Sequence, residues 1–513
     1  MEETDLMENK TPINQKKKRQ FPSAFTILFI ILIIAAIGTN FMPTGSYSKL
    51  LYNADTDMFD VTAPDGSLVS MDADQATLDK LNIKAQLGLF LNGSIYKPIG
   101  VPGSYEAIEP NPQGFTDCVL ALVNGVYDTI DISLFIFVLG GMLAYLNKSG
   151  AFAAGMGALS KATKGREFIL IILITILIAL GGTTFGMCEE TVALYAVVIP
   201  IFVLAGYDAL VGIAAVYLGS SIGTMCSTVN PFATVIASNA AGINFMEGFG
   251  IRIAALVVGT IICILYVIRY GNMVKKHPER SYILESKAYI EEKYCSEAEV
   301  PALTGRFKIV LVQFFFTFVI MVYGVVKLEW WFGEMTGLFL VSAIIMGIIL
   351  RMGEREMVNE FLAGAGDMIG VALICGVARS INVILENGLV SDALLNTMSG
   401  WVAGMSPYAF AIMMYFIYII LGFFINSTSG LAMLSIPIMA PLADAVGLPR
   451  EVVITAYLFG QGTMGFITPT GLVLVILQLV HVNYDKYLRF VLPLMGILVA
   501  FSIAFLCIEV ATV

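Results

Sequence analysis

The same set of helix-breaking motifs occurs twice in this chain, and each time it interrupts strongly apolar sequence. The first copy comprises Glu189-Glu190-Thr191, Ile199-Pro200-Ile201, Gly223-Thr224-Met225 and Asn230-Pro231. The second comprises Asn426-Ser427-Thr428, Ile436-Pro437-Ile438, Gly462-Thr463-Met464 and Thr468-Pro469. Interrupted apolar segments at matching places in two halves of a chain are typical of a transporter with its site near the bilayer midplane. The duplication therefore predicts an internal repeat around a central site.

The composition of the chain indicates an integral membrane protein. Of its 513 residues, 58% are apolar and 13% are charged, and the mean hydropathy is +0.83. Soluble domains contain about 25% charged residues, so we expect an all-α polytopic membrane protein. The seven cysteines form no C-x-x-C pair and predict no disulfide framework.

The apolar runs define the expected spans and domains. The predicted spans are 22–42, 129–146, 168–205, 209–240, 250–270, 307–328, 336–351, 366–383, 407–442, 451–480 and 489–509. The predicted domains are a tail at 1–21, a first transmembrane helix at 22–42, an insertion at 43–118, a first transport repeat at 119–270, a linker at 271–306 and a second transport repeat at 307–513.

The distribution of lysine and arginine predicts how the spans are oriented. Basic residues gather in the N-terminal tail and in the segments 147–167 and 269–308, which the positive-inside rule assigns to the cytoplasm. All basic loops share one side only if 168–205 and 407–442 each enter and leave from the same face. We therefore predict inverted repeats, each with a re-entrant hairpin and an interrupted helix, and a cytoplasmic N-terminus. Two full short spans are the alternative, but each limb is shorter than the roughly 20 residues that a span needs.

Residues 43–118 and 271–306 interrupt the apolar pattern. The first segment is acidic and carries turn signals such as Pro64-Asp65-Gly66 and Asn92-Gly93, which predict a small β-rich insertion outside the cytoplasm. Such an insertion either gates access or is peripheral. The second segment is rich in Glu and Lys and predicts a cytoplasmic linker that contains an amphipathic helix.

Two segments are poor candidates for continuous helix. Residues 223–231 contain Asn230-Pro231 and residues 460–471 contain Thr468-Pro469, and proline lacks the N–H that a helix requires. Unwinding there would free polar groups for a substrate or a cation. The substrate candidates are Ser227, Thr228, Asn230, Thr468 and Thr470, and a Na⁺ ion would lie near Thr224, Asn230 and Thr463. A proline kink with hydroxyls bonded to their own helix is the alternative.

The returning limbs of the hairpins start near Thr191 and near Asn426, Ser427 and Thr428. Free N–H groups at a helix start, with the helix dipole behind them, favour an anion such as a carboxylate. These four residues are therefore predicted to bind substrate, although helix capping alone would also account for them.

Ionisable residues at membrane depth are expensive and mark functional sites by default. Glu189 and Glu190 need a cation, which would be sodium, a proton, a basic substrate or an arginine. Alternatively, water in a cytoplasmic vestibule solvates them and they have no role in binding.

Arg379 is the one basic residue well inside a predicted span of the second half. It would neutralise a glutamate, bind a substrate carboxylate or extend to the interface.

Several local motifs carry a family resemblance. They are Phe21-Pro22-Ser23-Ala24-Phe25-Thr26, Val101-Pro102-Gly103-Ser104-Tyr105, the stretch 182–200, Gly376-Val377-Ala378-Arg379, the stretch 426–432 and the stretch 465–471. With these motifs the chain resembles the YfcC group of basic amino-acid antiporters, which is related to the C4-dicarboxylate anaerobic carriers of the ion-transporter superfamily. The resemblance implies an inner-membrane protein. Related structures are homodimers with two re-entrant hairpins and an elevator-type movement, so the resemblance implies the same features here.

Two hypotheses for function follow. The first is a basic amino-acid antiporter of the arginine/ornithine type that works by alternating access, and the second is a sodium- or proton-coupled C4-dicarboxylate carrier. Neither a phosphate-binding loop nor a nucleophile–base pair occurs in the sequence, so we expect no enzyme. The expected partners are a small-molecule substrate and the lipid bilayer, with no nucleic acid. The only cofactor expected is a coupling Na⁺ or H⁺.

Overall fold

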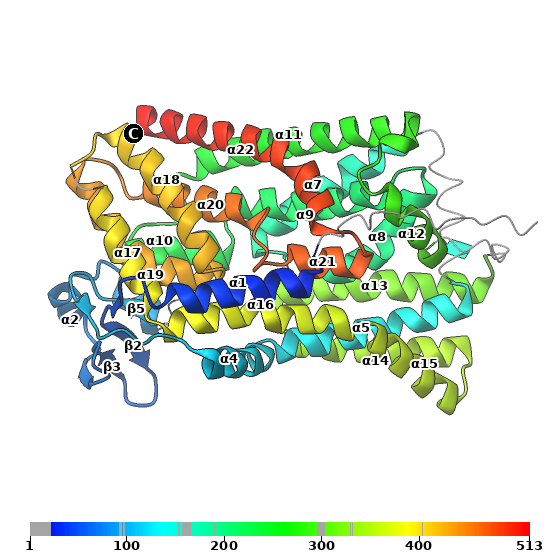
Figure 1. Cartoon of the computed structure of the whole chain (residues 1–513), viewed down its shortest axis with the longest axis horizontal. Coiled ribbons are helices and arrows are strands. Elements are labelled where there is room, and N and C mark those ends of the chain that lie inside the picture. Colours follow the sequence, from blue (N-terminus) through cyan, green and yellow to red (C-terminus); the bar gives the residue numbers. More distant parts are fainter. Residues whose placement is uncertain are drawn as a thin grey trace, which may run out of the picture.

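The computed structural model describes residues 22–91, 95, 98–151, 154–155, 166–188, 191–294, 303–328, 330, 332–402 and 404–513. Long helices lie roughly side by side, and small β-strands gather at one end of them (Figure 1). Within the described part of the chain, seven helices are long and apolar enough to cross a membrane. The predicted class, an all-α polytopic membrane protein, is confirmed.

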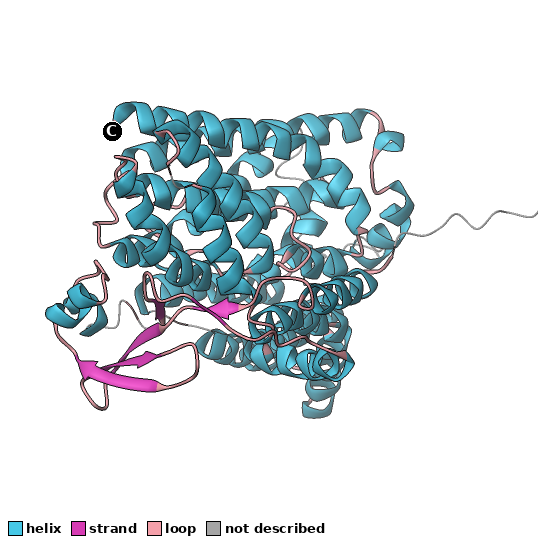
Figure 2. Cartoon of the chain, turned by 60° about the vertical axis from the view of Figure 1, so that its left-hand side comes forward, coloured by secondary structure: helices cyan, strands magenta, loops and turns pink. Residues whose placement is uncertain are grey.

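The first helix and the insertion follow the sequence closely. Helix α1 (Ala24–Gly38) starts at Ser23, whose hydroxyl accepts a hydrogen bond from the amide of Thr26. The strands beyond it are β1 (Gly45–Ser46), β2 (Lys49–Asn53), β3 (Met58–Thr62), β4 (Leu68–Asp72), β5 (Ile99–Gly100) and β6 (Glu106–Ala107). They form a four-stranded antiparallel sheet in the order β4-β3-β2-β5 and a separate β1-β6 pair. Figure 2 shows these strands outside the helix bundle, at one corner of the molecule.

Two short helices complete the insertion, α2 (Gln75–Lys80) and α3 (Leu87–Leu91). Leu50, Phe59 and Phe90 form its apolar centre. The predicted turn at Asn92-Gly93 lies outside the described residues. Helix α4 (Phe115–Asp128) begins earlier than the end of the predicted insertion, because the Asp117 carboxylate accepts a hydrogen bond from the Gly114 amide and fixes the helix start.

The remaining elements fall into two sets. The first set is α5 (Ile130–Ser149), α7 (Phe168–Phe185), α8 (Val192–Leu204), α9 (Ala209–Met225), η2 (Pro231–Val235), α10 (Ile236–Ala241) and α11 (Phe249–Lys276). A linker follows with η3 (Pro278–Arg280), η4 (Leu284–Ser286) and α12 (Lys287–Tyr294). The second set is α13 (Gly305–Leu328), α14 (Phe332–Leu350), α15 (Glu354–Asp367), α16 (Ile369–Asn387), α17 (Val390–Trp401), α18 (Pro407–Phe424), α19 (Thr428–Ala445), α20 (Glu451–Gly465), α21 (Val473–Val480) and α22 (Tyr484–Thr512).

The order of elements repeats between the two sets. A helix pair (α7 and α8, or α18 and α19) is followed by a helix that breaks off (α9, or α20), a short helix (α10, or α21) and a long helix (α11, or α22). Helix α10 contacts α19, and α21 contacts α8, so each short helix lies against the pair of the other repeat. The α8–α21 contact and the α10–α19 contact lie toward opposite ends of the bundle (Figure 1). This arrangement agrees with inverted repeats, while re-entry of the pairs into a bilayer stays a prediction.

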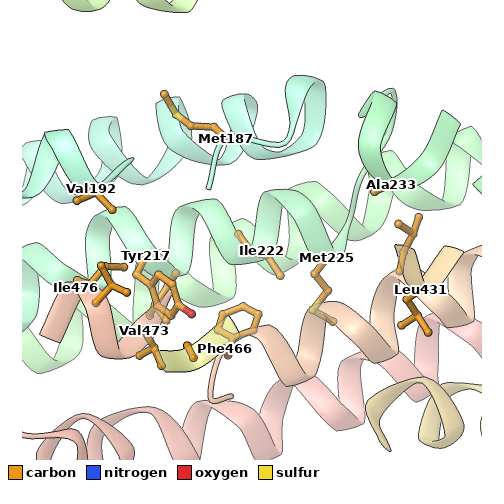
Figure 3. Packing of buried hydrophobic residues seen from close by; sticks show 14 of the residues in the cluster. Met187, Val192, Tyr217, Ile222, Met225, Ala233, Leu431, Phe466, Val473 and Ile476 are labelled. Carbon is orange, nitrogen blue, oxygen red and sulfur yellow. The ribbon is translucent and has the colours of Figure 1, made fainter. Parts of the chain in front are cut away.

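Small residues let the broken helices approach their neighbours closely, as is common between membrane helices. A Cβ atom on Gly223 of α9 would lie 2.3 Å from the carbonyl oxygen of Ala179 on α7. The two repeats meet where a Cβ on Gly462 of α20 would lie 2.6 Å from the Cβ of Met225. Figure 3 shows the apolar packing around this contact, with Tyr217, Ile222 and Met225 on α9.

Candidate functional site

A cavity of about 410 Å³, with many polar residues among those that line it, lies where the two helix pairs, the two helix breaks and α16 come together. Its polar and charged lining residues are Asp128, Thr129, Tyr217, Ser220, Ser221, Thr224, Asn230, Arg379, Asn382, Asn426, Ser427, Thr428, Ser429, Gln461, Thr468 and Thr470. Gly186 and Cys188, from the turn between α7 and α8, also line it. The cavity thus joins corresponding parts of both repeats.

The first helix break places one of its three predicted polar residues at the cavity. Asn230 lines the cavity, and its side chain accepts from the Phe232 amide at 2.9 Å and donates to the Gly182 carbonyl at 3.3 Å. Ser227 and Thr228 do not line it. Both are buried and bond to hydroxyls of their own repeat, Thr234 at 2.6 Å and Thr183 at 3.0 Å respectively. Their hydroxyls are therefore used to hold the unwound backbone.

The second break presents both of its predicted residues to the cavity. Thr468 and Thr470 line it, and their hydroxyls lie 2.7 Å apart. The side-chain amide of Asn426 donates to the backbone carbonyl of Thr470 at 3.1 Å, and this hydrogen bond links the tip of the α18–α19 pair to the break. The predicted interrupted helices are thus present in both repeats, and each break is fastened to the neighbouring helix pair.

Tyrosine hydroxyls satisfy the carbonyls that the second break releases, a feature that the sequence analysis missed. Tyr217 donates to the Gly465 carbonyl at 2.6 Å, and Tyr487 donates to the Phe466 carbonyl at 2.8 Å. Tyr484 donates to the carbonyl of Ile467. A buried tyrosine needs a partner for its hydroxyl, so tyrosines inside apolar helices were the available signal.

The tips of the helix pairs differ. Ser427 caps α19 by accepting from the Gly430 amide at 3.1 Å, and Asn426, Ser427 and Thr428 all line the cavity. In the first repeat the Thr191 hydroxyl is buried and donates to the Cys188 carbonyl at 2.6 Å, and Thr191 does not line the cavity. Glu189 and Glu190 lie outside the described residues.

The cavity contains one opposite-charge pair among the described residues. Arg379 of α16 donates to the Asp128 carboxylate at 3.0 Å and to the Glu386 carboxylate at 3.3 Å. Asp128 ends α4 and lines the cavity together with Arg379. The sequence analysis named Arg379 but not Asp128, although an acidic residue at the edge of a predicted span was a visible signal. The described partners of Arg379 are these two acids.

The three predicted sodium ligands are not equivalent. Thr224 lines the cavity, and its buried hydroxyl has no hydrogen-bond partner within the described ranges. The amide of Asn230 is committed to Gly182 and Phe232. Thr463 does not line the cavity, and its hydroxyl lies 3.1 Å from that of Tyr415. Of these three residues, Thr224 therefore offers a hydroxyl oxygen that has no partner among the described residues.

A duplicated helix bundle around a central cavity, with seven helices in the described residues that are suited to cross a membrane, is the architecture of a membrane transporter. The family model described as "C4-dicarboxylate anaerobic carrier" (DcuC) matches residues 21–511, and the chain belongs to this family.

The chain is also similar to two relatives over most of its length. The chain is 43% identical over 501 residues to an uncharacterized protein of Haemophilus influenzae, covering 97% of this chain and 98% of the relative. It is 32% identical over 385 residues to the "Putative basic amino acid antiporter YfcC" of Escherichia coli, covering 73% of this chain and 76% of the relative. The predicted resemblance to the YfcC group is confirmed.

Two solved transporter structures are similar at low sequence identity. One is the YdaH transporter of Alcanivorax borkumensis, with 12% identity, a TM-score of 0.40 and coverage of 96% of this chain and 99% of the other. The other is MtrF of Neisseria gonorrhoeae, with 18% identity, a TM-score of 0.38 and coverage of 96% and 95%.

Proposed function

We propose that this transporter exchanges basic amino acids across the membrane by alternating access. The observation that carries the proposal is the charge of the central cavity: the described charged residues that line it are Asp128 and Arg379, which are paired at 3.0 Å. This lining has no net charge. The α-carboxylate and α-ammonium groups of a basic amino acid match such a pair better than a dianion does, and its cationic side chain then needs a negative partner of its own.

The carboxylate end of the substrate has a suitable place at the second tip. Asn426, Ser427 and Thr428 line the cavity at the start of α19, where the helix dipole favours an anion. Arg379 lines the same cavity and would add a charge-assisted hydrogen bond if it released one of its acids.

The basic side chain needs a negative partner, and the proposal assigns it to Glu189 and Glu190. These residues follow directly after Cys188, which lines the cavity. The name of the Escherichia coli relative, a basic amino acid antiporter, supports the same choice. In the proposal, exchange of one cation for another requires no cofactor.

A sodium- or proton-coupled C4-dicarboxylate carrier is the second candidate, and the family description favours it. A dicarboxylate has two negative charges, whereas the described lining supplies one arginine that Asp128 already neutralises. Protonation of the site, or a sodium ion, would have to provide the missing charge. Thr224, whose hydroxyl has no partner in the described part of the chain, is the ligand that we would assign to sodium.

The setting in the membrane belongs to the same proposal. It includes an inner-membrane location, a cytoplasmic N-terminus, helix pairs α7–α8 and α18–α19 that enter and leave from one face, and a homodimer. The lysine and arginine distribution supports the orientation, and the positions of α8 and α19 at opposite ends of the bundle support the inverted pairs (Figure 1).

Counterflow in proteoliposomes tests the proposal. Vesicles are loaded with unlabelled arginine, ornithine, lysine or succinate, and uptake of labelled arginine or labelled succinate is followed without an ion gradient. We expect labelled arginine to accumulate only when a basic amino acid is inside. Accumulation of labelled succinate, or arginine uptake only with a sodium or proton gradient, would contradict the antiporter and favour the second candidate.

A further inference from the structure

A second cavity of about 390 Å³ lies beside the central one, under the β-rich insertion. Its walls come from the insertion, from α16 and α17, and from the α18–α19 pair. Two residues, Arg379 and Ser427, line both cavities. The two spaces are therefore neighbours, and these two side chains stand at their boundary. We call the second space the outer cavity.

The insertion is fastened to the helices and forms one wall of the outer cavity. The Asp392 carboxylate on α17 accepts from the Ser46 hydroxyl at 3.0 Å and from the Tyr47 amide at 3.1 Å. The Gly45 amide donates to the Leu389 carbonyl at 3.2 Å. A Cβ on Gly100 would lie 3.2 Å from the Leu434 carbonyl on α19, so β5 runs close to the second helix pair. These contacts hold the insertion over this side of the bundle.

Arg379 has one acidic partner in each cavity. Asp128 lines the central cavity and Glu386 lines the outer one, and the guanidinium bonds to both. The side chains of Arg379, Asp128 and Glu386 are 30%, 41% and 55% exposed. Ion pairs with this exposure contribute little to stability, so replacing one acidic partner of Arg379 by another costs little free energy. A contact that is weak and lies on a boundary is suited to opening and closing.

We propose that Arg379, held between Asp128 and Glu386, is the gate between the outer and central cavities, and that the β-rich insertion forms the vestibule that leads to it. This inference rests on the proposed alternating-access transport. A substrate carboxylate that reaches the outer cavity replaces Glu386 on the guanidinium, and the arginine then follows the substrate toward Asp128. In this proposal the insertion is part of the transport pathway and not a peripheral domain.

Thiol labelling tests the gate without any substrate. In a background with all seven cysteines replaced, single reporters are Ser221→Cys in the central cavity, Ser391→Cys in the outer cavity and Ser67→Cys on the exposed β3–β4 turn. A membrane-impermeant methanethiosulfonate reagent is added to the side on which Ser67→Cys reacts. Cationic and anionic reagents are compared to separate two effects. Loss of the Arg379 charge alone would accelerate the cationic reagent and slow the anionic one, whereas an opened gate would accelerate both.

With Arg379 present, we expect Ser391→Cys to react fast and Ser221→Cys slowly. In Arg379→Ala, Ser221→Cys should react about tenfold faster or more with both reagents, because an open state that is at most about 10% populated becomes dominant. Arg379→Lys should lie between the two, and Glu386→Gln should give a smaller acceleration. Arg355→Ala on α15 changes an exposed arginine that lines neither cavity, so it is the matched control and should change nothing.

Equal labelling of Ser221→Cys with and without Arg379 would overturn the gate, as would acceleration by the cationic reagent alone. Unchanged Ser391→Cys labelling and a monodisperse elution profile in detergent establish that each variant is folded. If Arg379→Ala does not fold, Glu386→Gln decides the question by the same readout. Counterflow can succeed while this labelling result fails, so the gate and the proposed substrate are tested separately.

Discussion

The two helix-pair tips occupy matching places in the repeats but offer different chemistry. At the second tip, Asn426, Ser427 and Thr428 face the cavity as neutral donors and acceptors at the start of α19. At the first tip, Thr191 turns its hydroxyl back to Cys188, and the two residues before it are Glu189 and Glu190. The duplication supplies one scaffold twice, and under the proposed function the divergence at the tips suits one tip to an anion and the other to a cation.

The largest expected effect comes from neutralising the acidic tip. Glu190→Gln should reduce labelled arginine counterflow by about 100-fold or more, because a buried or partly buried cationic group loses its charged partner. The matched change at the other tip, Ser427→Ala, should keep measurable exchange. Normal arginine exchange by Glu190→Gln would remove Glu190 from the cation site, and under the dicarboxylate alternative the variant would change mainly the pH or sodium dependence of succinate uptake.

The next effect concerns the close contacts that hold the broken helices. Gly223→Ala should destabilise the protein by about 1–3 kcal/mol, because its new methyl group would overlap the Ala179 carbonyl. Gly465→Ala is the control, since no neighbouring atom of the described residues lies within 4 Å of a Cβ at that position. Unfolding in mixed micelles measures both. A loss of stability that is equal in the two variants would show that glycine itself, and not close packing, matters.

A smaller effect is expected from the tyrosines that support the second break. Tyr487→Phe should lower the free energy of unfolding by about 1–2 kcal/mol, because the Phe466 carbonyl loses a buried hydrogen bond. Tyr323→Phe on the exposed face of α13 serves as the reference for the loss of a hydroxyl. If the two variants unfold alike, the break does not depend on this hydrogen bond.

The smallest expected effect is the loss of the cap at the second tip. Ser427→Ala should cost about 0.5–1 kcal/mol of stability, since the Gly430 amide loses its acceptor. Ser427→Thr keeps the acceptor and should stay close to the original protein. In counterflow, Ser427→Ala should weaken arginine affinity more than it lowers the maximal rate, which a structural cap alone would not do.

Much of the fold was predictable because it depends on local or periodic features. Apolar stretches fix where helices lie, and Pro231 and Pro469 fix where they break, because proline removes a backbone donor wherever it stands. The start of α19 at Thr428 follows from Ser427 as a helix cap. The start of α4 at Phe115 likewise follows from a local contact, the hydrogen bond from the Gly114 amide to the Asp117 carboxylate.

The candidate site was only partly predictable. Thr468 and Thr470 face the cavity, whereas Ser227 and Thr228, in the corresponding break, bond to Thr234 and Thr183 instead. The sequence shows the same kind of polar residue in both places. Which hydroxyl faces open space depends on how each unwound backbone is turned toward its neighbours, and that information is not local.

Charge pairing was beyond sequence reasoning for the same reason. Arg379 pairs with Asp128, which is 251 residues away. Arg252 at the start of α11 and Glu509 near the end of α22 are also far apart in the sequence, and both are buried. Both charged groups lie beside Gly248: a Cβ atom on this glycine would be 2.8 Å from the Arg252 Nη1 atom and 3.2 Å from the Glu509 Oε1 atom. The sequence by itself determined the membrane class, the repeat and the helix breaks, because these follow from composition, spacing and backbone chemistry. Only the tertiary structure decided which charges meet and which polar groups line the cavity, because both depend on packing between helices that are remote in the chain.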